Sequence, residues 1–397
     1  MKCFDRMIYT GVSEVLAAGK SVLLLGPRQV GKTTFCKRLL PDWSVNLADP
    51  TVKQKYERDV SVLKAEIMAL ANRLQAPPLV LIDEIQKVPE VLDLLQLLID
   101  EGVAQFMITG SSARKLRRSA SVNLLPGRVI HFVMDGLSTP ELKDRGLELK
   151  ELLLYGTLPE VILTENPKMK ERLLKSYVVT YLEEEVRQEA LVRSLGSFSR
   201  FLELCASEAG QLVNFIKLSQ EIGVAHATLK GYFEILQDCL LLTLIEPFSS
   251  AKTRRRLLKA PKYLFFDLGV RRLAAREGLE LSLETMGRLF EQHVGLEILK
   301  LIHAEESPAK LTFWADSNGM EIDWVIQNKE SLLPIEVKWS AHIRDQDTKH
   351  LRLFLKEHPE VQKALVVARV EYAMQLSDKL WVIPWHELAA EVLQFLA

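Results

Sequence analysis

The sequence predicts an α/β protein: a parallel sheet with its helices, then a helical middle region, then a second α/β domain. Five short apolar runs in the first 140 residues alternate with helix-length segments, which favours a parallel sheet covered on both faces. Helical periodicity dominates after residue 140, and strand-like runs return after residue 309. Because 397 residues exceed one ordinary core, we expect several domains. Their expected bounds are 1–140, 141–198, 199–270 and 271–397.

Composition narrows the classes of function. The net charge of −1 excludes a global electrostatic attraction to nucleic acid, so any such binding must use local patches. The four cysteines show neither a CxxC pair nor the spacing of a zinc site. There is no signal-peptide core and no apolar run of 18 residues, so we expect a cytoplasmic protein without a membrane span. Motifs of serine hydrolases and zinc proteases are absent from the sequence.

The segment SVLLLGPRQVGKTTFCKRLL (21–40) predicts a strand, a loop and an amphipathic helix. The loop fits G-x-x-x-x-G-K-[ST], in which glycines let backbone N–H groups turn toward phosphate oxygens. Lys32 would hold the β- and γ-phosphates, and Thr33 would ligate Mg²⁺. The expected cofactors are therefore ATP and Mg²⁺. The expected nucleotide-binding residues are Gly26, Pro27, Arg28, Gln29, Val30, Gly31, Lys32, Thr33 and Thr34.

Two further apolar runs end in polar side chains. The run 79–82 is followed by Asp83, which would hold Mg²⁺ through water, and by Glu84, which would polarise the attacking water. The run 105–112 ends in hydroxyls, and Thr109, Ser111 or Ser112 could sense the γ-phosphate. A plain Gly-Ser turn explains each hydroxyl nearly as well. Runs 43–49 and 128–136 complete the five expected strands.

These motifs, together with ITGSSARKL and LLPGR, resemble the AAA+ superfamily of ATPases. The resemblance is to a prokaryotic branch in which such a core is fused to a nuclease-like C-terminal domain. It implies a homo-oligomer and an arginine finger at Arg128, which would act across a subunit interface. Arg114, Arg117 and Arg118 compete for that role, and a solvated basic loop is the alternative reading of these three.

The middle region contains an amphipathic helical pattern at 168–192 with a solvated EEE run. At 213–248 a helix-turn-helix pattern is followed by a strand-like apolar run, which predicts a winged-helix-like domain. Five apolar residues of the second pattern would pack its two helices together, while His226, Thr228 and Lys230 would face outward. Two interpretations of this pattern remain open: a module that contacts DNA, and a compact module that only packs within the protein. The basic run KTRRRLLK (252–259) lies where a wing would be and favours DNA, because phosphate contacts need such clusters. The packing residues are Leu218, Ile222, Leu229, Phe233 and Leu236.

The C-terminal region predicts an amphipathic helix at 286–304, with Glu291 beside its apolar stripe, and then three short strands. Side chains alternate along a strand, so Glu336 and Lys338 share one face. Asp323 lies opposite Glu336 if the turn is the four residues 328–331, whereas a three-residue turn would send it to the other face. Adjacent carboxylates favour a hard divalent cation such as Mg²⁺. An exposed hairpin with a charged face remains the alternative.

This pattern resembles the restriction-endonuclease-like family, whose PD-(D/E)xK signature maps onto Asp323, Glu336 and Lys338. The resemblance implies metal ligands at Glu291, Asp323 and Glu336, and a nuclease lysine at Lys338. The leading hypothesis is an AAA+-type ATPase that couples ATP turnover to DNA binding or processing, including metal-dependent cleavage. The alternatives are a nucleotide-controlled interaction protein with a catalytically silent C-terminal domain, and a signalling switch with little turnover.

Overall fold

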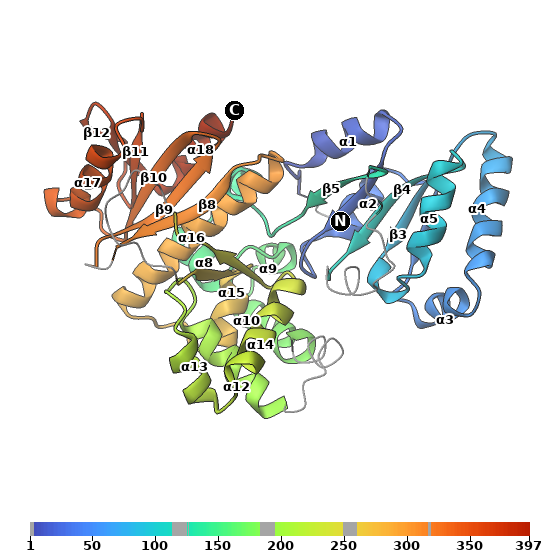
Figure 1. Cartoon of the computed structure of the whole chain (residues 1–397), viewed down its shortest axis with the longest axis horizontal. Helices are drawn as coiled ribbons and strands as arrows, with labels where there is room; N and C mark the ends of the chain where they lie inside the picture. Colours follow the sequence, from blue (N-terminus) through green and yellow to red (C-terminus); the bar gives the residue numbers. More distant parts are fainter. Residues whose placement is uncertain (1–3, 113–124, 126, 183–194, 249–259, 317–318) are drawn as a thin grey trace. The chain divides into compact units, whose positions relative to one another are not determined.

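The computed structural model describes residues 4–112, 125, 127–182, 195–248, 260–316 and 319–397. It consists of two compact units (Figure 1): residues 1–137 with 238–241, and residues 138–237 with 242–397. The first boundary falls three residues before the domain limit expected at residue 140. The finer division at residues 198 and 270 stays a prediction.

The first unit is built on a five-stranded sheet in which every strand pairing is parallel, in the order β2-β3-β4-β1-β5. All five strands that the sequence predicts are present, which confirms the α/β reading of this region. Parallel strands bring their carboxyl ends to one edge, so the loops after β1, β3 and β4 meet there. The strands are β1 (Ser21–Leu25), β2 (Trp43–Asn46), β3 (Leu79–Asp83), β4 (Gln105–Gly110) and β5 (Val129–Val133).

The helices of the first unit begin at recognisable caps. Asp49 accepts hydrogen bonds from two backbone N–H groups at the start of α3, and Asp59 does the same for one at the start of α4. Helix α5 places Val91, Leu95 and Leu98 in a core shared with β3 and β4. The helices are α1 (Tyr9–Ala17), α2 (Lys32–Arg38), α3 (Pro50–Arg58), α4 (Val60–Leu74) and α5 (Val91–Asp100).

The second unit begins with short helices and contains the expected pair at 213–248. Helices α13 and α14 are joined at Gly223, whose φ of 76° suits a glycine, and strand β6 (Leu242–Ile245) follows them. The five apolar residues expected to pack this pair are buried, and His226, Thr228 and Lys230 are exposed, as the sequence predicts. The helices are α7 (Thr139–Leu142), α8 (Leu149–Tyr155), α9 (Pro159–Leu163), α10 (Pro167–Ser176), α12 (Leu195–Ser207), α13 (Phe215–Ile222), α14 (His226–Asp238) and α15 (Leu268–Ala274).

The amphipathic segment at 168–192 differs from a single regular helix. Helix α10 ends at Ser176, and a π-helical segment continues over Tyr177–Leu182. The run Val178, Val179 and Thr180 is β-branched, which lowers helix propensity at this point. The EEE run (183–185) lies outside the described residues, and so does the basic run 252–259.

A six-stranded mixed sheet forms the C-terminal part of the second unit, in the order β12-β13-β11-β10-β9-β8. Strands β8, β9 and β10 pair antiparallel, whereas β10, β11 and β13 pair parallel. The strands are β8 (Lys310–Ala315), β9 (Glu321–Asn328), β10 (Ser331–Lys338), β11 (Ala364–Ala368), β12 (Met374–Ser377) and β13 (Leu380–Pro384). The accompanying helices are α16 (Leu283–Ala304), α17 (Lys349–Glu357) and α18 (Leu388–Leu396).

A two-stranded ribbon, β6 (Leu242–Ile245) and β7 (Lys262–Phe265), lies beside this sheet. Ile245 pairs with Lys262, and the N–H group of Phe248 donates to the carbonyl oxygen of Phe313 on β8 (2.6 Å). The ribbon is therefore held against the edge strand of the sheet.

The register of the β9–β10 hairpin settles which side chains share a face. Ser331 pairs with Asn328, and Ile335 pairs with Trp324, so the turn is the four residues 328–331. Continued by one residue, the same register brings Asp323 opposite Glu336. Of the two turn lengths that the sequence leaves open, the four-residue turn is the one present, and it puts these two carboxylates on one face. None of the helices in the described ranges is long and apolar enough to cross a membrane.

Candidate functional site

The phosphate loop follows β1 at the carboxyl edge of the parallel sheet. A side chain at Gly26 would bring its Cβ to 2.1 Å from the carbonyl oxygen of Met134, so the position requires glycine. Gly31 has a φ of 99°, which suits glycine just before α2. Arg6 donates to the carbonyl oxygens of Val30 (2.9 Å) and Asp135 (2.7 Å). Nothing in the sequence pattern points to Arg6 as a support of this loop.

Lys32 is almost fully buried within its own loop. Its Nζ donates to the carbonyl oxygens of Gly26 and Pro27, at 2.8 Å each. Burial lowers the pKa of Lys32 to about 8, although the nearby Glu84 and Asp83 act to raise it. An ammonium group held in this way is ready to exchange loop carbonyls for phosphate oxygens.

Asp83, at the tip of β3, accepts two hydroxyl hydrogen bonds. Thr33 donates its Oγ1 proton to the carboxylate, with Oγ1 lying 2.8 Å from Oδ2, and Thr109 donates to Oδ1 at 2.5 Å. The Oγ1 of Thr109 also accepts from the backbone N–H of Glu84 (3.1 Å). The predicted Mg²⁺ ligands Thr33 and Asp83 therefore lie in direct contact, with Thr109 behind them.

Glu84 has a left-handed backbone conformation, with φ at 59° and ψ at 50°. The hydroxyl of Ser111 donates to Glu84 Oε2 (2.9 Å), and Gln86 donates both to Ser111 Oγ (2.8 Å) and to Glu84. The buried Ser112 Oγ has no hydrogen-bond partner within the residues that the structure describes. Two of the three hydroxyls expected to sense the γ-phosphate, those of Thr109 and Ser111, thus contact the acid pair.

Arg128 lies just before β5, at the amino edge of the same sheet, and its Nε donates to Asp100 Oδ1 at the end of α5 (2.7 Å). The phosphate loop follows β1 at the carboxyl edge, so Arg128 is remote from the loop of its own chain. A role at a nucleotide would have to be played across a subunit interface. Arg114, Arg117 and Arg118 lie outside the described residues.

The second unit gathers carboxylates from one helix and two strands. Oxygen atoms of Glu291 (α16), Glu321 and Asp323 (both β9) lie within 4.8 Å of one another. Asp323 Oδ2 accepts the backbone N–H of Val337 (2.7 Å), which directs it toward Glu336 on β10. These four side chains, Glu291, Glu321, Asp323 and Glu336, are called the acidic cluster below.

Burial shapes the electrostatics of the acidic cluster. Burial, followed by the nearby Asp323, raises the pKa of Glu291 to about 7 and raises that of Glu336 well above its usual range. Burial likewise raises the pKa of Asp323. Glu336 is 5% exposed, and its Oε2 has no hydrogen-bond partner in the described ranges. A set of hard oxygen donors, one of them unpartnered, suits a divalent cation.

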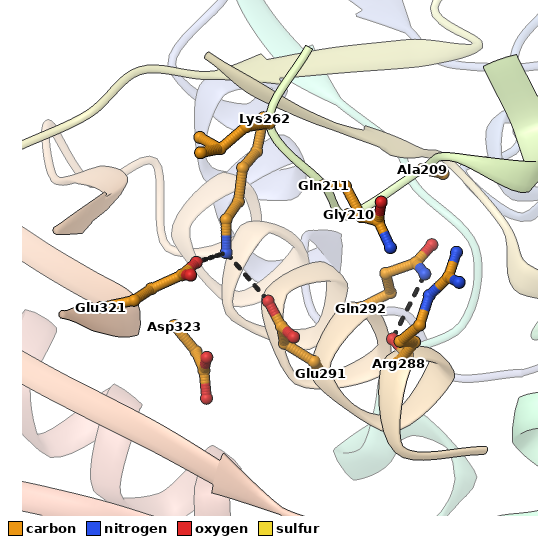
Figure 2. A pocket seen from close by; sticks show the side chains of 10 residues that line it. Ala209, Gly210, Gln211, Lys262, Arg288, Glu291, Gln292, Glu321 and Asp323 are labelled. Atoms are coloured by element: carbon orange, nitrogen blue, oxygen red, sulfur yellow. Dashed lines mark hydrogen bonds and ion pairs between the residues drawn. The ribbon is translucent and has the colours of Figure 1, made fainter. Parts of the chain in front are cut away.

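Two lysines contact the acidic cluster. Lys338 Nζ lies 2.6 Å from Glu336 Oε1, and the sequence predicts this lysine. Lys262, from β7, places its Nζ 3.0 Å from Glu291 Oε1 and in contact with Glu321. In Figure 2 the ammonium lies between those two glutamates, and the carboxyl group of Asp323 points away from it. A pocket of about 420 Å³ opens beside them, lined also by Arg288 and Gln292.

The sequence pattern did not single out Glu321 or Lys262. Glu321 had a signal, because it stands two residues before Asp323 and so shares its face of β9. Lys262 had none, since it lies 59 residues before Glu321 at the start of an apolar run.

Comparison with known families supports part of this picture. Residues 18–143 match the model of an AAA domain, residues 146–281 a domain of unknown function (DUF8612), and residues 286–388 another domain of unknown function (DUF4143). The AAA match, together with the parallel sheet, indicates nucleotide binding of the ATPase type in the N-terminal unit.

The similar curated proteins are themselves uncharacterized. Protein Rv2008c of Mycobacterium tuberculosis is 25% identical over 368 residues, which cover 91% of this chain and 79% of the relative. Protein MJ1544 of Methanocaldococcus jannaschii is 22% identical over 355 residues, which cover 82% of this chain and 76% of the relative. The crystal structure of protein VC1899 from Vibrio cholerae aligns over 95% of this chain and 98% of its own, with 12% identity and a TM-score of 0.22. That structural likeness is too low to bear on fold or function. The chain is thus similar to an AAA domain over residues 18–143 and to a domain of unknown function over residues 286–388.

Proposed function

We propose that the chain is an AAA+-type protein that binds and hydrolyses ATP with Mg²⁺, and that it couples turnover to the binding and metal-dependent processing of DNA. We place it in the cytoplasm as a homo-oligomer. The observation that carries the DNA part is the convergence of Glu291, Asp323 and Glu336 with Lys338 in one cluster, in which Glu336 is buried and the other three are half-buried. The phosphate loop and the Thr33–Asp83 contact carry the ATP part.

In the nucleotide unit, Lys32 would transfer its hydrogen bonds from loop carbonyls to the β- and γ-phosphates. Thr33 and Asp83 would hold Mg²⁺ together, and the hydrogen bond that they share supports this role. Glu84 would polarise the attacking water, and its hydrogen bonds with Ser111 and Gln86, which orient its carboxylate, support this role.

In the acidic cluster, Asp323 and Glu336 would hold a divalent ion. Such an ion lowers the pKa of a bound water and neutralises charge on a scissile phosphate. Lys338, 2.6 Å from Glu336, would orient the water or the phosphate. On α14, the exposed His226, Thr228 and Lys230 would contact DNA phosphates.

ATP hydrolysis is tested with two variants. Lys32→Ala is expected to abolish ATP binding, because it removes the phosphate-binding ammonium. Glu84→Gln should bind ATP normally but hydrolyse it about 10²–10⁴-fold more slowly. Arg73→Ala, an exposed change on α4, is the control. Hydrolysis by Lys32→Ala at the wild-type rate would show that the nucleotide assignment is wrong.

Cleavage of DNA is tested with Mg²⁺ or Mn²⁺ and labelled duplexes. Asp323→Ala and Lys338→Ala should each lose cleavage, whereas Glu330→Ala, an exposed acid in the nearby turn, should retain it. Binding should weaken as salt rises, because phosphate contacts release counterions.

A second candidate is a nucleotide-controlled interaction protein whose acidic cluster is catalytically silent. The contact of Lys262 with Glu291 and Glu321 favours it, since an ammonium already neutralises part of the cluster. Absence of both cleavage and salt-dependent DNA binding in the wild type would select this candidate.

A further inference from the structure

The acidic cluster has two sides that meet at Asp323. On one side Asp323 lies opposite Glu336, and Lys338 contacts Glu336 from the same strand. On the other side Glu291 and Glu321 flank a second ammonium group, that of Lys262 (Figure 2). The unpartnered oxygen, Glu336 Oε2, belongs to the first side.

Lys262 is held in a buried position. Its side chain is 3% exposed, and its Nζ lies 5.1 Å from the centre of the Phe313 ring and 5.3 Å from that of Trp324. Aromatic faces attract an ammonium, so rings and carboxylates together replace its water shell. A surface lysine that makes a passing ion pair would be exposed instead.

The backbone around Lys262 is fixed as well. The residue opens β7, which pairs with β6, and the end of β6 is hydrogen bonded to β8 through Phe248 and Phe313. The ammonium is thus delivered by a ribbon outside the six-stranded sheet that carries Glu321 and Asp323.

The charges of the acidic cluster suit a single ion. Its four carboxylates, when ionised, and the two lysines that contact them leave two formal negative charges. One divalent cation neutralises these, whereas a second would leave the cluster positive and would have to displace a buried ammonium.

We propose that Lys262 is a tethered cation that occupies the Glu291–Glu321 side of the acidic cluster, so that the site takes one divalent ion, held by Asp323 and Glu336. The inference rests on the metal-binding part of the proposed function. It adds that the ribbon residue Lys262, contributed from outside the sheet, fixes the number of ions.

The number of bound ions tests the proposal directly. Mn²⁺ is titrated into the full chain without nucleotide, by calorimetry and by electron paramagnetic resonance of the free ion. The count for Asp323→Asn is subtracted, because that variant lacks the ligand common to both sides. Wild type should then bind one ion and Lys262→Met two, since methionine keeps the packing against Trp324 and removes the charge. Lys310→Met, an exposed change on β8, should bind one.

The outcomes separate this proposal from the proposed function. One ion in both wild type and Lys262→Met would overturn the role of Lys262 and leave the metal site standing. Two ions in the wild type would also overturn it. No ion in the wild type would overturn it together with the metal site, whatever Lys262→Met binds.

A second measurement needs no variant and decides the matter if Lys262→Met does not fold. Lysine amines of the wild type are acetylated with and without saturating Mn²⁺, and the modified residues are identified by mass spectrometry. Lys262 should stay protected in both samples, while exposed Lys310 reacts in both. Reaction of Lys262 only after Mn²⁺ is added would mean that the ion displaces it, and would overturn the proposal.

Discussion

Thr109 links the two acids of the nucleotide site. Its hydroxyl donates to Asp83 and accepts from the backbone N–H of Glu84, a residue with a positive φ. The same small side chain therefore orients the carboxylate expected to hold Mg²⁺ and fixes the backbone that carries the expected water-polarising acid. In the sequence, this threonine is one of several hydroxyls at the end of an apolar run.

We expect Thr109→Val to separate hydrolysis from binding. Valine keeps the shape but leaves Asp83 and the Glu84 N–H each short of a partner, which should cost about 1–3 kcal/mol of unfolding free energy. ATP hydrolysis should fall more than ATP affinity. The loss of stability is measured by denaturation, at the unfolding transition that shifts when ATP binds. Steady-state kinetics measure the losses of hydrolysis and of ATP affinity. Thr10→Val, an exposed change on α1, should alter neither, and equal losses of affinity and turnover would contradict this role.

Cys36 gives a prediction with a defined pH dependence. Burial, followed by the nearby Asp83, raises the pKa of its thiol to about 12. At pH 8 roughly one thiol in 10⁴ is then ionised, and the thiolate is the form that reacts. Because the folded pKa lies above the unfolded one, the thiol favours the folded state below about pH 9, and this contribution is lost as pH rises toward 12. Iodoacetamide should leave Cys36 unlabelled in the native protein and label it after unfolding; rapid native labelling would refute this.

Residues of the candidate site differ in how far the sequence could reveal them. Asp323, Glu336 and Lys338 are singled out by the signature that they resemble, and whether they share a face depends on strand alternation and one turn length, both of which are local. Lys262 comes from a separate ribbon, and its place depends on how β7 lies against β8 and β9. No periodicity records such a tertiary contact. Arg6 escapes notice for the same reason, because its partners are carbonyl oxygens on loops far along the chain.

At the scale of elements, the approach of α16 to β9 brings Glu291 to the acidic cluster. A Cβ at Gly295 would lie 2.6 Å from the Trp324 ring, so only glycine allows this distance. The indole N–H of Trp324 also donates to the carbonyl oxygen of Glu291 (3.0 Å). The helix and the strand are thus held in a fixed register within one turn of Glu291.

Gly295→Ala should move α16 away from β9. The added methyl overpacks the contact with Trp324, at a cost of about 1–3 kcal/mol, and should weaken Mn²⁺ binding by shifting the neighbouring Asp323 on β9. Gly287→Ala is the matched control on the same helix, because its Cβ would meet Trp339 at an ordinary 3.7 Å. That control should gain up to about 1 kcal/mol from helix propensity and keep its affinity. For both variants, denaturation measures the free energy of unfolding and calorimetry measures the affinity for Mn²⁺. Similar effects of the two substitutions would contradict the proposed role of Gly295.

The elements themselves were predictable to different degrees. The five strands of the first unit are short apolar runs between turn residues, and the sequence places all of them. The sequence predicts one amphipathic helix over 168–192, yet the helix changes at Tyr177–Leu182, which is π-helical. Apolar spacing reports which side chains face the core, but it does not distinguish the hydrogen-bond patterns of closely related helices.

For the whole molecule, the position of Arg128 bears on assembly. It lies at the amino edge of the parallel sheet, paired with Asp100, whereas the phosphate loop lies at the carboxyl edge. If Arg128 completes a nucleotide site, it must complete that of a neighbouring subunit in an oligomer.

Mixing two inactive variants tests this arrangement. Lys32→Ala lacks a working phosphate loop but keeps Arg128, and Arg128→Ala has the converse defect. In equal mixtures that exchange subunits, about a quarter of the interfaces of a ring would join an intact loop to an intact arginine. ATPase activity of the mixture should therefore recover to about a quarter of the wild-type activity. The recovery should require ATP-dependent assembly, which is monitored by measuring the mass of the oligomer. Arg73→Ala should be active by itself. Full activity of Arg128→Ala alone, or no recovery in mixtures shown to exchange, would exclude an arginine finger at Arg128.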